Sequence, residues 1–95
     1  MTRAALVAWL RSRAPAPPAG LREHLEAAAT DTAEQLPEHL ARLGAELLAR
    51  VVGQPAGGRE LALDLLAADA FVTYAFEAQA EADPAGLVRL AERVG

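Results

Sequence analysis

Cysteine and lysine are absent from this 95-residue sequence, and serine occurs once, at Ser12. Without cysteine the chain can form no disulfide, no thiolate metal site and no cysteine nucleophile. Without lysine it has no amine for Schiff-base chemistry and no lysine for a phosphate-binding P-loop. Ser12 lies beside a proline-rich stretch and outside any G-x-S-x-G motif. These absences exclude most hydrolase and kinase mechanisms, so we expect neither enzymatic activity nor a cofactor.

Long uncharged runs are also missing, since the longest, Ala14–Leu21 and Val51–Gly58, have eight residues each. A helix that crosses a bilayer needs about 20 apolar residues, and the apolar stretch Ala4–Leu10 is too short for a secretory signal. We therefore expect no membrane segment and a cytoplasmic location. Nucleic acid is not expected as a partner, because phosphate binding needs clustered basic residues and the net charge is −4. The lack of Lys, Asn, Ile and Cys beside abundant alanine and arginine indicates a bacterial gene.

The residues that remain favour helices: there are 24 alanines and 15 leucines, against 6 valines and 4 threonines. No segment alternates apolar and polar residues as a half-buried strand does. We predict an all-α fold, a small antiparallel bundle of about five helices that forms one domain over residues 1–95. Its expected parts are a short N-terminal helix over 1–13, a proline-rich linker over 14–20 and a helical bundle over 21–95.

Capping residues and prolines divide the chain into helices. Thr2 and Asp83 are expected N-caps, and Pro37 belongs in the first turn of a helix. Gly53 is expected to end the preceding helix in the left-handed conformation. The end of the second helix stays open between residues 30 and 36. The expected helices cover residues 2–13, 21 to about 30, 36–52, 59–82 and 83–95.

The N-terminal part leaves two interpretations open. The prolines of residues 14–20 make a stiff spacer, with a ligand for a proline-recognising domain as the alternative. Trp9 lies on the short helix that this spacer joins to the bundle. We predict that Trp9 packs on its own bundle, and the alternative is a partner contact, because tryptophan is enriched at binding hot spots.

The helix over 36–52 carries two patterns. Its core-facing stripe has three- and four-residue spacing and consists of Leu36, Leu40, Leu43, Leu47 and Val51. A second pattern is a ladder of alternating charge made of Glu38, Arg42, Glu46 and Arg50. We interpret the ladder as a solvated face, with partner docking as the alternative.

The helix over 59–82 is apolar around most of its circumference, so we expect it at the centre, covered by the other helices or by a second copy in a homodimer. Asp69 lies on the same side as Leu61, Leu65 and Val72 at about 100° per residue. We therefore expect Asp69 in an apolar interior, where a carboxylate needs a hydrogen-bond partner. Thr73, His24, His39 or an arginine of another helix are the expected partners.

His24 and His39 are expected at the margins of apolar faces, as packing residues with one wet edge. Neither lies in a Glu-x-x-His or His-Glu-x-x-His motif, so no metal site is expected. The weak candidates for a cofactor- or ligand-binding site are Asp69, Thr73, His39 and His24.

The pattern as a whole predicts a non-enzymatic protein–protein interaction module with an accessory or regulatory role. One alternative is a bundle that binds a ligand or a metal, or acts as an enzyme, through an interior polar site around Asp69. A second alternative is a self-associating structural element. A cavity that Asp69 shares with a histidine would favour the ligand-binding alternative. The candidate partner-contact residues are Trp9, Glu38, Arg42, Glu46 and Arg50.

Overall fold

The computed structural model describes residues 1–54 and 57–94, and the predicted all-α bundle is confirmed in them. Gly95, the last residue of the predicted bundle, lies outside the described residues. A 3₁₀ turn, η1 (Pro84–Gly86), precedes the last helix. The α-helices are α1 (Arg3–Arg11), α2 (Ala19–Ala28), α3 (Leu36–Val52), α4 (Arg59–Ala82) and α5 (Leu87–Val94).

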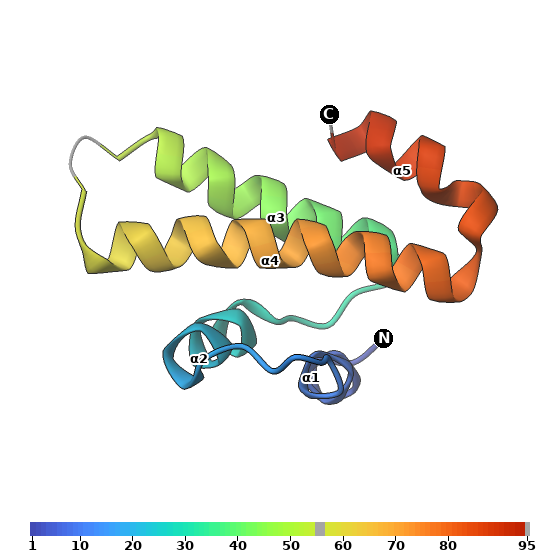
Figure 1. Ribbon diagram of the computed structural model, residues 1–95, viewed down its shortest axis with the longest axis horizontal. Coiled ribbons are helices and arrows are strands. Elements are labelled where there is room, and N and C mark those ends of the chain that lie inside the picture. The colour runs from blue at the N-terminus through green and yellow to red at the C-terminus, as the bar shows by residue number, and fades with distance from the viewer. Residues whose placement is uncertain (55–56, 95) are drawn as a thin grey trace.

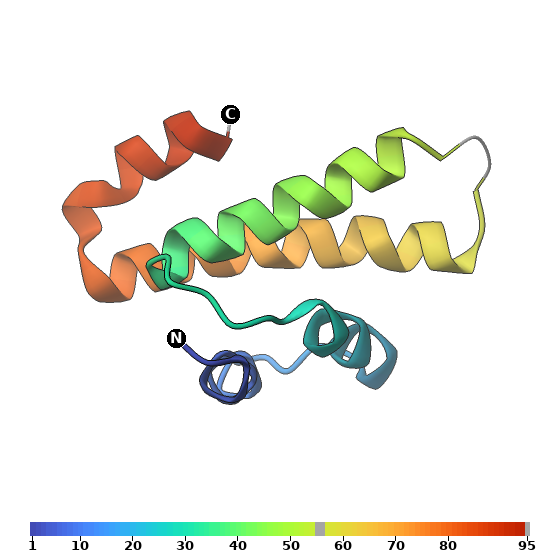
Figure 2. The same cartoon turned by 180° about the vertical axis from the view of Figure 1, so that it is seen from behind.

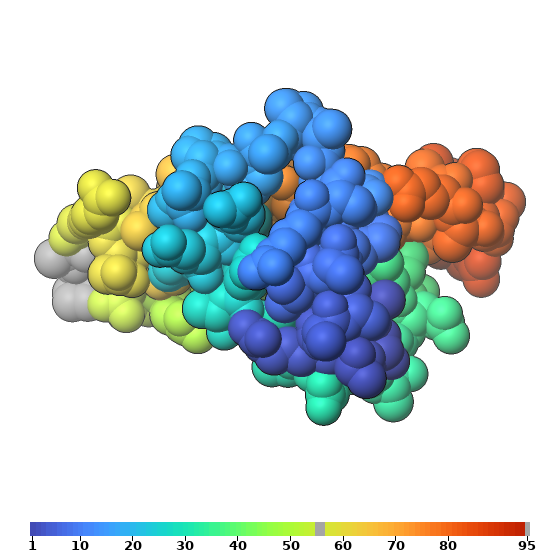
Figure 3. Space-filling model, turned by 90° about the horizontal axis from the view of Figure 1, so that it is seen from below, coloured from blue at the N-terminus to red at the C-terminus, as the bar shows by residue number. Residues whose placement is uncertain are grey.

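Helices α3 and α4 form a long antiparallel hairpin that runs the length of the molecule (Figure 1). Helices α1 and α2 lie on one side of this hairpin and cross it, whereas α5 folds back over the other side (Figures 1 and 2). Seen from the side of α1 and α2, the N-terminal helices cover the middle of the hairpin, and its two ends project beyond them (Figure 3). Helix α4 contacts α2, α3 and α5, which makes it the central helix, as predicted.

Two helix starts follow the predicted capping chemistry, whereas α2 begins at Ala19, inside the linker predicted over 14–20, and has no side-chain cap. The Thr2 hydroxyl accepts a hydrogen bond from the backbone N–H of Ala5, and the Asp83 carboxylate caps the η1 turn. The prediction for Gly53 was wrong, because this residue has right-handed angles of φ −78° and ψ −8°. Its N–H donates to the carbonyl of Ala49, so the helical turn continues through the glycine without a left-handed residue.

The core lies between the α3–α4 hairpin and the N-terminal helices. From α3 it takes the predicted leucine stripe, of which Leu40, Leu43 and Leu47 are buried. From α4 it takes mainly alanine, with Phe71 as the largest fully buried side chain. The face of α4 that was expected inside is not the buried one, since Leu65 is 51% exposed and Asp69 is exposed. The remaining buried hydrophobic residues are Leu6, Val7, Leu10, Leu25, Ala29, Ala67, Ala68, Tyr74, Ala75, Ala78 and Leu90.

A close approach of α3 to α4 at Gly44 explains which face of α4 is buried. A Cβ atom at Gly44 would lie 2.9 Å from Val72 Cγ2 and 3.1 Å from the Ala68 carbonyl oxygen. The absent side chain at Gly44 leaves room for Ala68, Phe71 and Val72 of α4 at this point. Leu65 and Leu66 lie elsewhere around α4 and are about half exposed.

Replacement of Gly44 by valine should lower the free energy of unfolding by about 1–3 kcal/mol, because the added atoms meet the stiff Val72 side chain and the α4 backbone. Gly20→Val is the matched control, since a Cβ there meets nothing within 4 Å. Its effect should stay within about 0.5 kcal/mol. Urea denaturation measures both variants, and equal effects would contradict the close approach.

Candidate functional site

A groove of 420 Å³ lies on the side of the α3–α4 hairpin that carries α5. Small residues form much of its floor, and the charged residues belong to α3, α4, α5 and the segment before α3. Its apolar lining consists of Ala41, Gly44, Ala45, Leu48, Leu65, Ala68, Val72 and Val94. Its charged lining consists of Glu34, Glu38, Arg42, Asp69 and Arg93.

The groove has an apolar half and a charged half. Toward the α3–α4 connection, Leu48 and Leu65 face solvent from adjacent helices and are 48% and 51% exposed. Val52 lies one turn beyond Leu48 on α3 and is 78% exposed. Toward α5, the lining changes to the charged residues, so an apolar surface is bordered by charge at one end.

Asp69 lines this groove and is exposed, so the prediction of an interior Asp69 was wrong. Thr73 is also exposed and is not among the groove residues, and neither histidine is. The structure thus does not bring Asp69, Thr73 and a histidine together. The physical reason is the rotation of α4 set at Gly44, which turns the side of the helix with Asp69 away from the core.

The buried carboxylate of α4 is Asp64, which the sequence analysis missed. It is 7% exposed, and one of its oxygens lies 2.6 Å from His24 Nε2 of α2. The guanidinium of Arg50 approaches the same oxygen from α3 at 3.9 Å. Asp64 therefore joins three helices. A signal was available, because Asp64 precedes Ala68, Phe71 and other buried residues of α4 at three- and four-residue spacing.

A second hollow, of 440 Å³, lies where α4 begins, and Asp64 forms part of its wall. Its other lining residues come from the first turns of α4 and from the segment before it, and Arg59 and Glu60 are among them. Asp64 borders this hollow without His24, and no serine, threonine or cysteine is in its described lining. The pair can therefore orient a proton but has no side-chain nucleophile beside it.

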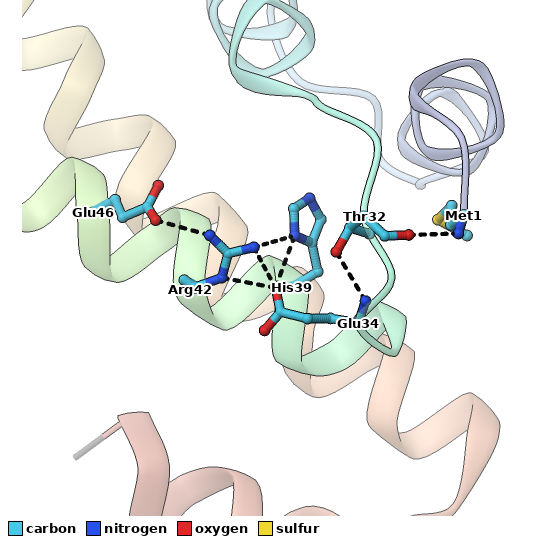
Figure 4. Close-up of polar contacts among 6 residues, drawn as sticks. All are labelled: Met1, Thr32, Glu34, His39, Arg42 and Glu46. Carbon is cyan, nitrogen blue, oxygen red and sulfur yellow. Dashed lines mark hydrogen bonds and ion pairs between the residues drawn. The ribbon is translucent and has the colours of Figure 1, made fainter.

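His39 is fully buried, which corrects the prediction of a boundary residue. Its Nδ1 atom lies 3.2 Å from an Arg42 nitrogen and 3.4 Å from a Glu34 oxygen (Figure 4). Arg42 also donates to Glu34 through Nε at 2.7 Å and to Glu46 at 3.0 Å. The hydrogen bond from Arg42 lowers the pKa of Glu34 below its ordinary value. This network holds the segment before α3 against the helix.

The same segment also fixes the N-terminus. The Thr32 hydroxyl accepts from the Glu34 N–H at 3.0 Å, and the Thr32 carbonyl accepts from the Met1 amino group at 2.8 Å (Figure 4). The Asp31 carboxylate accepts from the backbone N–H of Arg3, at the start of α1. The polar residues between α2 and α3 thus connect α1 to α3, which is a structural role.

The predicted charge ladder does not stay on one face. Residues four apart drift by about 40° around a helix, so Glu38 and Arg50 end about 120° apart. Of the ladder steps, the ion pair Arg42–Glu46 forms, at 3.0 Å. Glu38 turns into the groove and Arg50 turns toward Asp64 on the other side. The ladder is therefore divided between two environments.

Trp9 is partly buried and packs against the core of its own bundle. Its ring meets Tyr74 edge-on, with 6.1 Å between the ring centroids, and the Arg13 guanidinium lies 3.8 Å from the centre of its ring. Arg13 also pairs with Glu81 at 2.7 Å and with Glu77 at 3.4 Å. These contacts engage Trp9 with α4 and support the packing interpretation over a partner contact.

Comparison with known proteins leaves the function to be inferred from geometry. No protein-family model, curated protein or solved structure matches this chain. Within residues 1–54 and 57–94, no group of three or more histidine, aspartate and glutamate residues is placed to hold a metal ion. In the same residues, no helix has the length and apolar character needed to cross a membrane. Among the described residues, the groove is an apolar surface that the fold leaves partly exposed.

Asp64→Ala should cost about 2 kcal/mol of folding free energy, because it removes a charged hydrogen-bond acceptor from a largely buried contact with His24. Asp69→Ala makes the same chemical change on the exposed side of α4 and should stay within about 0.5 kcal/mol. Urea denaturation checks both. A double-mutant cycle with His24→Ala should give a coupling of about 1 kcal/mol or more, and additive effects would contradict the pairing.

Tyr74 is the single tyrosine and should ionise at a higher pH in the folded protein than in urea. Burial raises its pKa above 10.0, and the charge of Glu77 raises it further, while Arg13 opposes the shift. The resulting stabilisation is fully present below about pH 10 and is lost as pH rises through the folded-state pKa. Ultraviolet titration of tyrosinate measures the midpoint, which Glu77→Gln should lower. Equal midpoints in buffer and urea would contradict the prediction.

Proposed function

We propose that this chain is a non-enzymatic protein–protein interaction module, an accessory or regulatory protein that binds a helix of its partner in the groove on α3 and α4. The observation that carries the proposal is the open apolar half of the groove, where Leu48 and Leu65 stand about half exposed over a floor of alanine and glycine. As the sequence favours, we also propose that the protein is cytoplasmic and does not bind nucleic acid.

The helices of the hairpin carry more apolar surface than the fold covers. On α3, Ala41, Ala45 and Leu48 form a stripe at four- and three-residue spacing, separate from the leucine stripe in the core. On α4, Leu65, Ala68 and Val72 repeat at similar spacing. Such stripes are typical of helices that pack on both faces in a bundle. Small residues in the floor allow another helix to approach to an axis distance of about 8–10 Å.

The energetics favour an elongated partner over a small one. Complete burial of the half-exposed Leu48 and Leu65 would contribute about 1 kcal/mol each. Loss of translational and rotational freedom on association costs about 4 kcal/mol or more. A partner must therefore contact the full length of the groove, including the charged half, and a helix does so in a straight line.

The ligand-binding and enzymatic alternatives depended on an interior polar site around Asp69. Asp69 lies on an open groove without a histidine, so an enclosed polar site around it is not formed. A metal or small-molecule function would need another site.

Self-association is the second candidate, because the same exposed residues favour it. Leu48, Val52 and Leu65 of one copy facing those of another across a two-fold axis would bury an apolar centre. The charged half of each groove would then lie at the rim, as in ordinary interfaces.

A designed helical peptide of about 18 residues, with one leucine stripe and otherwise alanine and glutamine, should bind the protein. Leu48→Glu and Leu65→Glu should each weaken binding about tenfold or more, because a charge replaces a buried contact. Leu66→Glu is the matched control, since Leu66 is 53% exposed but lies about 100° further around α4. Fluorescence anisotropy measures the affinities.

Binding that is equal in all three variants would place the peptide elsewhere and would contradict the proposal. Native mass spectrometry of the same proteins tests the second candidate. A dimer that Leu65→Glu dissociates and Leu66→Glu preserves would establish self-association through the groove.

A further inference from the structure

We infer that the helix received by this groove is basic: an amphipathic helix whose arginine or lysine residues pair with Glu38 and Asp69 beside its aliphatic stripe. This inference rests on the proposed function and adds the chemistry of the partner. Three observations carry it: two acids on the groove walls without ion pairs, the engagement of the nearby arginine elsewhere, and the composition of α5.

Glu38 is the first of these acids. It lines the groove from α3, and its Oε2 atom is buried without a hydrogen-bond partner in the part of the chain that the structure describes. The Glu38 side chain as a whole is partly exposed in the groove, where a basic side chain can approach its carboxylate. Asp69 faces the groove from α4, and none of the ion pairs formed within residues 1–54 and 57–94 includes it.

The arginines of the groove do not neutralise these two acids. Arg42 forms ion pairs with Glu34 and Glu46 and none with Glu38. Arg93, at the end of α5, lies within 4.0 Å of no acidic oxygen among the described residues. The groove lining therefore holds three acids and two bases, and the whole chain has a net charge of −4. A basic helix complements both charges.

Helix α5 shows that this side of the hairpin packs against an amphipathic helix. It packs on the same side of the hairpin, buries Leu90 and carries Arg89, Glu92 and Arg93, so its side chains have a net charge of +1. The groove is lined at one end by Arg93 and Val94 of α5 and at the other by Leu48 and Leu65. A partner helix would thus extend the surface that α5 already occupies, and a helix with the composition of α5 is the natural fit.

The spacing of the groove residues sets the pattern of the partner. Along α4, Asp69 lies four residues from Leu65, about 6 Å, and along α3, Glu38 lies ten residues from Leu48, about 15 Å. The partner therefore places one basic residue about one turn, and a second about three turns, from its main aliphatic contact. A helix of three to four turns contains this pattern.

The test uses three peptides of about 18 residues with the same leucine stripe and with arginine, glutamine or glutamate at the two flanking positions. On the wild-type protein at low salt, the arginine peptide should bind about tenfold more tightly than the glutamate peptide, with glutamine between. The difference should shrink as salt is added, because exposed charges are screened. This comparison needs no variant of the protein.

A charge exchange then assigns the effect to the groove. Asp69→Lys changes an exposed residue and should reduce or invert the preference for arginine over glutamate. Glu23→Lys is the matched control, because Glu23 is an exposed acid on α2, on the other side of the hairpin. It should leave the ratio of the two affinities within about twofold.

The outcomes separate the two proposals. If all three peptides bind with equal affinity and Leu65→Glu abolishes this binding, the inference of a basic partner is overturned and the helix-binding function stands. No binding, together with a dimer that Leu65→Glu dissociates, overturns it in favour of a second copy as the occupant. No binding by a monomeric wild-type protein overturns both.

Discussion

The contact of α3 with α4 at Gly44 determines the rotation of the central helix, and most other features follow from that rotation. A Cβ atom at Gly44 would lie 3.1 Å from the Ala68 carbonyl oxygen, so this position of α3 has no room for a side chain. Ala68 and Ala75 therefore point inward, and Asp64 follows them on the same side of α4. Leu65 and Asp69 lie about 60° and 100° around the helix from Ala68 and line the groove. The rotation of α4 thus leaves Asp64 buried and Asp69 exposed.

The helices themselves could be predicted, because local chemistry specifies them. The bounds of α3 and α4 agree with the expected ranges, since Pro37 lies in the first turn of α3 and glycines follow Val52 before α4 begins. The orientation of α4 could not be predicted from apolar periodicity, because leucine, alanine and phenylalanine surround the helix and no single face stands out. Alanine makes up four of the seven buried residues of α4, whereas Leu65 and Leu66 are about half exposed. Alanine at the spacing of Ala68 and Ala75, facing a helix that contains Gly44, was the relevant signal.

The contact of His24 with Asp64 could not be predicted from the sequence for a different reason. His24 and Asp64 are separated by 40 positions along the chain, and their pairing depends on how α2 crosses the hairpin. No spacing rule within one helix contains that information. The charge ladder of α3 failed as a single surface because a four-residue repeat drifts around a helix whose period is about 3.6 residues. Its members consequently serve separate purposes: Arg42 holds the segment before α3, Arg50 faces Asp64, and Glu38 enters the groove.

The open groove itself arises from unequal cover on the two sides of the hairpin. On one side of the hairpin, α1 contributes three buried residues and α2 contributes Leu25. On the other side, α5 has eight residues, or about 12 Å of helix, against seventeen residues and about 25 Å in α3. The part of α3 beyond α5 therefore keeps Leu48 and Val52 exposed. At the boundary between covered and open surface, Arg93 and Val94 of α5 line the groove beside residues of α3 and α4.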